Sequence, residues 1–106
     1  MARSGRDPTA GLSDRIRDAL RRQRKARRIA ARHLMNEIER GLALAEHGMR
    51  TRALGRREEY LRQARDTYLQ LELSLSKFEL KPRQFALIRL HLERLGARIQ
   101  AAEQSS

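Results

Sequence analysis

The fold is decided by the stretch from Ile29 to Gly48, which reads IAARHLMNEIERGLALAEHG. Small and apolar residues recur in it every three or four positions. They are Ala30, Leu34, Ile38, Gly41 and Ala45. Because successive residues of an α-helix are about 100° apart, this spacing places them on one face, which packs against another element. The stretch therefore predicts a core-facing helix.

The same apolar face continues toward the N-terminus, but it is interrupted. Ile16 and Leu20 lie on it, whereas Gln23 and Arg27 follow them at positions that also face the core. An arginine there would be buried without a partner if the helix packed along its whole length. We therefore predict close packing after the interruption and a protruding basic arm over residues 13–28.

The remaining pattern predicts two more helices. Ser13 is a suitable N-cap, Gly48 a suitable stop for the first helix, and Pro82 a first-turn residue of the last one. These signals predict helices over residues 13–47, 53–79 and 83–102. We expect residues 1–12 to form a flexible tail and residues 13–103 a single helical-bundle domain. No β-type alternation occurs, so the predicted class is all-α, an antiparallel bundle of three long helices.

Each of the two later helices carries two apolar faces. The predicted core faces comprise Leu54, Leu61, Ala64, Tyr68, Leu71, Leu75 and Phe78 in one helix and Phe85, Ile88, Leu92, Leu95 and Ile99 in the other. The second set comprises Leu69, Leu73, Leu80, Leu87 and Leu90. A helix that is apolar on two faces needs two partners, so we predict a homo-oligomer with these five leucines in its interface. In the alternative, a wide core face or the arm covers them.

Charge is the most unusual property of the chain. It has 24 basic and 13 acidic residues among 106, and most of the basic residues are arginine. Residues 1–33 contain 11 of the basic and 3 of the acidic residues. The planar donor fork of arginine suits phosphate, although a GC-rich genome would also enrich arginine and alanine without any function.

The basic residues of the first helix form a row about 20 Å long, at 1.5 Å rise per residue. Its members are Arg17, Arg21, Arg24, Lys25, Arg28 and Arg32. A second cluster follows the first helix and comprises Arg50, Arg52, Arg56 and Arg57. Like charges at i,i+4 repel unless a counter-charge relieves them, and a phosphate backbone supplies one. We predict that these ten residues bind nucleic acid; the alternatives are a solvated face or an arm that binds an acidic protein.

Residues that could perform chemistry are scarce. His33, His47 and His91 lack the helical i,i+3 or i,i+4 spacing of a zinc motif. There is no cysteine, no Gly-rich phosphate loop and no nucleophile elbow. We therefore expect no enzyme activity, no metal and no cofactor. The lack of cysteine fits a cytoplasmic location, and no apolar run reaches the ~20 residues of a membrane span, so we expect no membrane partner.

Three segments of the chain resemble a known family. They are LALAEHG with the link MRTRALGRR (residues 42–57), REEYLRQARDTYLQLELSLSKFEL (57–80) and KPRQFALIRLHLERLGARI (81–99). Together, residues 31–100 resemble the small four-helix-bundle proteins that include the accessory variability determinant of diversity-generating retroelements and the ribosomal-RNA intervening-sequence proteins. The family's separate first helix is missing here or fused into one long helix.

The resemblance implies a basic, ring-shaped oligomer, a pentamer in the retroelement case, that binds nucleic acid and assists a reverse transcriptase. We accordingly expect a non-catalytic accessory protein that binds RNA rather than DNA and assists a reverse transcriptase or a similar ribonucleoprotein. The alternative is a helical protein-interaction module whose basic arm docks on an acidic protein partner. Binding that weakens with salt and copurifying absorbance at 260 nm would distinguish the first from the second.

Overall fold

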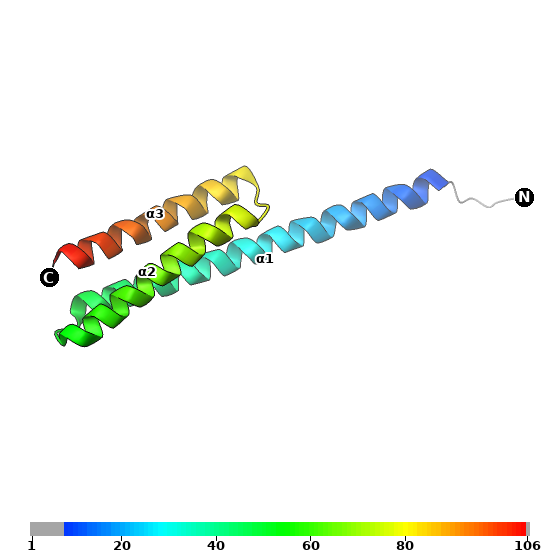
Figure 1. Cartoon of the computed structure of the whole chain (residues 1–106). Coiled ribbons are helices and arrows are strands. Elements are labelled where there is room, and N and C mark those ends of the chain that lie inside the picture. The colour runs from blue at the N-terminus through cyan, green and yellow to red at the C-terminus, as the bar shows by residue number, and fades with distance from the viewer. Residues whose placement is uncertain (1–7, 106) are drawn as a thin grey trace, which may run out of the picture.

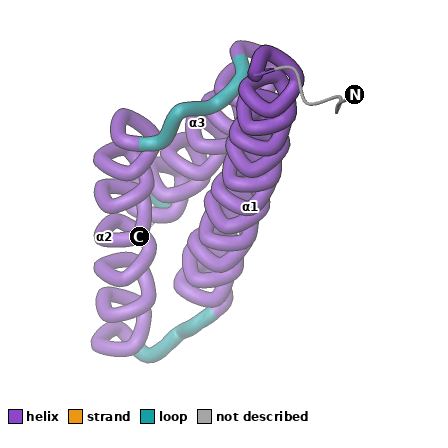
Figure 2. The backbone as a smooth tube through the Cα atoms, turned by 90° about the vertical axis from the view of Figure 1, so that its right-hand side faces the viewer, coloured by secondary structure: helices purple, strands orange, loops and turns teal. Residues whose placement is uncertain are grey.

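The computed structural model describes residues 8–105, which form three α-helices and, within that range, no strand (Figure 1). The helices are α1 (Pro8–Arg50), α2 (Leu54–Lys77) and α3 (Pro82–Gln104). Two short loops, one at each end of the packed region, connect them, so α2 returns beside α1 and α3 reverses again (Figures 1 and 2). The prediction of an all-α fold with three helices is confirmed.

The first helix is longer than predicted at both ends. It begins at Pro8 instead of Ser13, because proline is well suited to a first helical turn, where its missing N–H is not needed. Residues 8–12, which we expected in the tail, therefore belong to α1, and the rest of the expected tail, residues 1–7, lies outside the described residues. At the other end the helix passes through Gly48 and ends at Arg50.

Gly48 is a packing residue and not the helix stop that we predicted. It is buried inside α1, and a Cβ atom at this position would lie 2.9 Å from Leu61 Cδ2 of α2. Carbon atoms in ordinary contact are about 3.5–4.0 Å apart. A side chain at Gly48 would thus require Leu61 to shift or the two helices to move apart near the first loop.

All three helices contribute to one hydrophobic core. Its buried members are Leu34, Ile38, Ala45, Ala64, Leu71, Leu75, Ile88, Leu92, Leu95 and Ile99. Each was predicted to face the core. Burying a leucine or isoleucine side chain contributes about 1.5–3 kcal/mol, so this shared core, more than helix propensity, holds the long helices together.

Two glycines let α3 approach its neighbours. A Cβ at Gly41 of α1 would lie 2.8 Å from Leu95 Cδ2 of α3, and a Cβ at Gly96 of α3 would lie 3.0 Å from the Tyr68 ring of α2. Gly41 was predicted on the core face. Its hydrogen in place of a side chain makes room for Leu95, which is completely buried.

Near the helix ends, several apolar residues do not lie on the faces to which they were assigned. The second helix ends at Lys77, two residues earlier than predicted, and the 100° step of a helix no longer applies beyond it. Phe78, which we placed in the core, is 40% exposed, whereas Leu80, which we placed on the outer face, packs against the core. Leu54 and Phe85, in the first turns of α2 and α3, are also exposed instead of buried.

The N-terminal part of α1 projects beyond the rest of the molecule (Figure 1). The helix has 43 residues against 24 in α2 and 23 in α3, so at 1.5 Å per residue it is longer than either by about 28 Å. Ile16 and Leu20 are accordingly more than half exposed, while Leu34 is buried. The arm predicted from Gln23 and Arg27 is therefore present as a continuous helix.

Candidate nucleic-acid interface

The predicted basic row lies on the arm and on the part of α1 that follows it. All six of its side chains are exposed, and within residues 8–105 none of them forms an ion pair. Glu46 follows Arg28 by 18 residues, which is about five full turns, and its carboxylate accepts a 2.9 Å hydrogen bond from Arg98 of α3. The row therefore lies on the same side of α1 as Glu46, and in the last turns of the helix this side faces α3.

At the base of the arm, the row meets the start of α3. Three of its members, Arg21, Arg24 and Arg28, line a depression of about 260 Å³ together with Lys81 and Gln84. Lys81 and Gln84 were not among the predicted site residues. No spacing in the sequence could identify them, because more than fifty positions separate them from Arg28 and only the α2–α3 loop brings them near.

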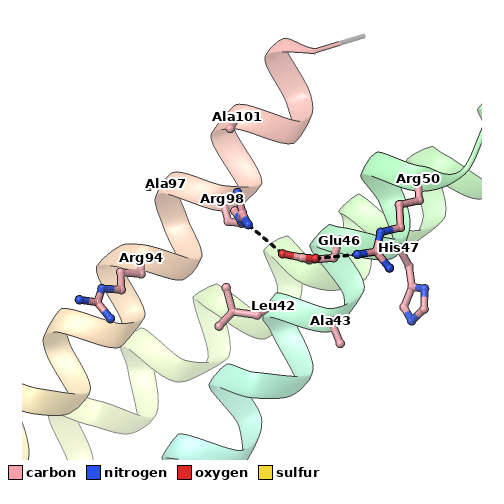
Figure 3. Close-up of a pocket in the computed structure, with 9 residues that line it drawn as sticks. All are labelled: Leu42, Ala43, Glu46, His47, Arg50, Arg94, Ala97, Arg98 and Ala101. Carbon is pink, nitrogen blue, oxygen red and sulfur yellow. Dashed lines mark hydrogen bonds and ion pairs between the residues drawn. The ribbon is translucent and has the colours of Figure 1, made fainter.

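Basic side chains in the middle and last turns of α1 and α3 form a second group. A groove of about 720 Å³ between these helices is lined by Arg50, Arg94, Arg98 and His47 around Glu46 (Figure 3). The Glu46 carboxylate accepts hydrogen bonds from Arg98 (2.9 Å) and Arg50 (3.5 Å). Arg94 and Arg98, four residues apart on α3, were also not predicted as site residues.

The second predicted cluster does not act as one unit. Arg50 faces the α1–α3 groove, and Arg52 and Arg56 are exposed near the first loop. Arg57 instead joins two helix ends, because its Nη2 donates to the Ala102 carbonyl (2.9 Å) and to the Ser105 hydroxyl (2.8 Å) at the end of α3. These bonds satisfy groups that a helix C-terminus leaves free, so we assign Arg57 a capping role in place of nucleic-acid binding.

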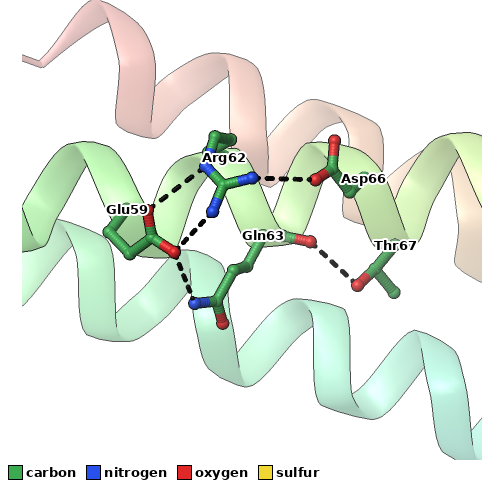
Figure 4. Close-up of polar contacts among 5 residues, drawn as sticks. All are labelled: Glu59, Arg62, Gln63, Asp66 and Thr67. Carbon is green, nitrogen blue, oxygen red and sulfur yellow. Dashed lines mark hydrogen bonds and ion pairs between the residues drawn. The ribbon is translucent and has the colours of Figure 1, made fainter.

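Two arginines of α2, Arg62 and Arg65, differ from those of the row because acidic side chains pair with them. The Arg62 guanidinium donates to Glu59 at 2.6 Å and contacts Asp66 at 3.5 Å (Figure 4). Hydrogen bonds from Arg62 and Gln63 lower the pKa of the Glu59 carboxyl, and the bond to Glu59 raises the pKa of Arg62. Glu59 thus belongs to a solvent-exposed ion pair, and no residue of the basic row has a comparable partner within residues 8–105.

Four of the five leucines predicted for an oligomer interface lie on the surface of the chain. Leu69 and Leu73 of α2 are each 57% exposed, and Leu87 and Leu90 of α3 are about half exposed. Leu80 is the exception, because it packs against the core of its own chain. The predicted second apolar face therefore exists on both helices without Leu80.

The described residues contain neither a metal-binding cluster nor a membrane-spanning helix. Among residues 8–105 no group of three or more histidine, aspartate or glutamate side chains is placed to hold a metal ion. The same range contains no helix whose length and apolar character would allow it to cross a bilayer. His47 stacks instead at a tilt on Tyr60, with ring centroids 5.6 Å apart, beside the first loop.

Comparison with known proteins adds no relative. The chain matches no protein-family model, no curated protein and no solved structure. The resemblance of residues 31–100 to the retroelement accessory and intervening-sequence proteins therefore stays a prediction, and the site must be interpreted from its own geometry.

Proposed function

We propose that the chain is a non-catalytic nucleic-acid-binding protein, and that its arm binds the phosphate backbone. One observation carries the proposal: six exposed basic side chains in one row of α1 have no acidic partner within residues 8–105, whereas Arg62 of α2 has two. The arm, residues 13–28, has eight basic and two acidic residues. The like charges of such a helix repel one another and destabilise it unless counter-charges from outside the chain neutralise them.

A phosphate backbone supplies that counter-charge in a matching form. Its charges are regularly spaced along a line, as are those of the row, and each contact releases condensed counterions, which favours binding without reading sequence. Arginine binds phosphate through two parallel donors. The proposal therefore predicts affinity for many sequences and strong weakening by salt. The preference for RNA and the reverse transcriptase partner rest on the family resemblance alone.

We also propose that the chain self-associates through the exposed leucines of α2 and α3. Leu69 and Leu73 are four residues apart on one helix, and Leu87 and Leu90 are three apart on the other, so each pair makes a short apolar ridge. Exposed apolar area of this kind is typical of protein–protein contacts. A cytoplasmic location fits the cysteine-free sequence.

The test replaces four members of the row, Arg21, Lys25, Arg28 and Arg32, with glutamine. Glutamine retains helix propensity, so the variant changes charge and leaves the fold intact. The matched control replaces four exposed basic residues outside the row with glutamine: Arg40, Lys77, Arg83 and Arg89. Both variants have the same net charge and differ in where the charge was removed; the control also breaks the exposed Arg89–Glu93 ion pair (3.5 Å), which should matter little for stability.

Binding to a labelled single-stranded oligonucleotide of about 20 nucleotides, longer than typical single-strand sites of ~4–16, is measured by fluorescence anisotropy. We expect the row variant to lose about tenfold or more in affinity at low salt, and its slope of log affinity against log salt to become shallower by about three units. The control should bind nearly as the unmodified chain does. Equal losses in both variants, or none in the row variant, would reject the arm as the binding site and favour an acidic protein partner.

A further inference from the structure

The depression at the base of the arm combines basic groups from two distant segments. Three lining residues, Arg21, Arg24 and Arg28, belong to α1, and Lys81 is the residue that immediately precedes α3. The fifth lining residue, Gln84, uses its Oε1 atom to accept the Lys81 backbone N–H at 3.1 Å. Its amide nitrogen is left as a donor, so every side chain that lines the depression has donors to offer a ligand.

Among residues 8–105, no carboxylate lines this depression. Glu79 is close in sequence to Lys81, but its carboxylate accepts from Gln23 Nε2 at 3.5 Å and does not line the depression. Arg27 adds a further cation to the same turns of α1, and its Nε atom is buried without a hydrogen-bond partner. The folded chain thus collects positive charge at this point, and the carboxylate nearest to it in the α2–α3 loop, that of Glu79, is not among the residues that line the depression.

We infer that this depression is a phosphate-binding cradle in which Lys81 fixes a nucleic-acid backbone against the bundle; this inference rests on the proposed function. A phosphate oxygen accepts hydrogen bonds and carries the opposite charge, which suits three guanidinium groups, one ammonium group and one amide donor. The arm by itself offers only a straight row of charges, along which a strand could slide. Lys81 lies off that row, so it adds a contact at a fixed distance from the core.

The occupant is a chain of phosphates and not a single one. The row extends beyond the depression in both directions, to Arg17 on one side and to Arg32 on the other. These ends are about 22 Å apart at 1.5 Å per residue, which is too far for one phosphate group to neutralise both. A polymer with regularly spaced phosphates reaches the whole row and passes through the cradle.

The experiment compares Lys81→Gln with Lys77→Gln in the full chain. Lys77 is the matched control because it is exposed in the last turn of α2 and does not line the depression. Circular dichroism first verifies that both variants keep the helicity of the unmodified chain. Affinity for the labelled single-stranded oligonucleotide is then measured between about 50 and 200 mM salt.

We expect Lys81→Gln to weaken binding by about threefold for every sequence and to make the salt slope shallower by about one unit. Lys77→Gln should change neither quantity. Equal losses in both variants would overturn the cradle, because they would report net charge alone. If Lys81→Gln keeps the affinity of the unmodified chain while the row variant loses affinity, the cradle is overturned and the proposed function is retained. If the row variant also keeps its affinity, the proposed function fails as well.

A second measurement identifies the source of the phosphate. The side-chain amide signals of Gln84 are followed by nuclear magnetic resonance during titration with the oligonucleotide and, separately, with inorganic phosphate. We expect the oligonucleotide to shift them at micromolar concentration and inorganic phosphate only at millimolar concentration. Saturation by micromolar inorganic phosphate without a response to the oligonucleotide would overturn the assignment to a nucleic-acid backbone.

Discussion

Replacing Gly41 by valine should destabilise the fold, because this position has no space for a side chain. The first added atom, Cβ, would lie 2.8 Å and 3.2 Å from the two Cδ atoms of Leu95 and 3.3 Å from Thr67 Cγ2. Leu95 is completely buried, so its side chain can give way only by repacking against its neighbours in the core. Overpacking of a well-packed core costs about 1–3 kcal/mol, and valine adds two further methyl groups in the same space.

The helix propensity of valine offsets only part of this cost. Valine is better than glycine inside a helix by about 0.4 kcal/mol, so the net loss in the free energy of unfolding should be about 2 kcal/mol. For a chain of this size that corresponds to a decrease of about 10 °C in Tm. Urea and thermal unfolding followed by circular dichroism, at one fixed protein concentration, measure both quantities.

Gly55→Val is the control for this experiment. Gly55 lies in the first turn of α2, and nothing would come within 4 Å of a Cβ atom there. The same substitution should therefore leave the free energy of unfolding almost unchanged or raise it slightly. If Gly41→Val were as stable as Gly55→Val, the close approach of α1 to α3 would be refuted.

Further predictions concern the core, the surface charges and self-association. Leu95→Ala should cost about 2–5 kcal/mol in the free energy of unfolding, because a fully buried leucine leaves a cavity; a loss below about 1 kcal/mol would indicate a loose core. Because the pKa of Glu59 is lowered in the folded chain, its contribution is present at neutral pH and is lost as the pH falls through that lowered pKa. The urea midpoints of Glu59→Gln and of the unmodified chain should thus differ slightly at pH 7 and converge at pH 2. Midpoints that move further apart on acidification would contradict a lowered pKa for Glu59. Leu73→Glu should lower the mass measured by sedimentation while helicity is kept, and an unmodified chain that is already monomeric at tens of micromolar would contradict the interface.

Periodicity predicted most of the fold because it is a local property. Apolar residues that recur every three or four positions place Leu34, Ile38 and Ala45 on one helix face and so predict their burial. The interruption of this face at Arg27 predicts where the packing of α1 weakens. These inferences need only the geometry of a single helix. They hold for the middle turns of the helices and fail for Leu54 and Phe85 in the first turns.

The errors arise where a helix ends or two helices meet. Phe78 and Leu80 were misplaced because α2 ends at Lys77, and a wheel drawn past that residue assigns the wrong face. Gly48 was interpreted as a stop, although its small size instead admits Leu61. No pattern within one helix carries information about the neighbour that approaches it.

For the candidate site, too, the part that lies within one helix could be predicted, and the part contributed by another segment could not. The row from Arg17 to Arg32 follows from the helical step alone, and its exposure agrees with the arm. Lys81 enters the site only because the second loop places it beside Arg28. Arg57 was assigned to the site by proximity in sequence, whereas its hydrogen bonds go to the end of α3.

The central claim is that the arm binds nucleic acid through phosphates. It is tested most directly by the affinity of the nuclease-treated, full-length chain for a single-stranded oligonucleotide across about 50–200 mM salt. If the six residues of the row each contact one phosphate, log affinity should fall against log salt with a slope near −4, and oligonucleotides of unrelated sequence should give the same line. Absence of binding at the lowest salt, or an affinity that does not change with salt, would contradict the claim.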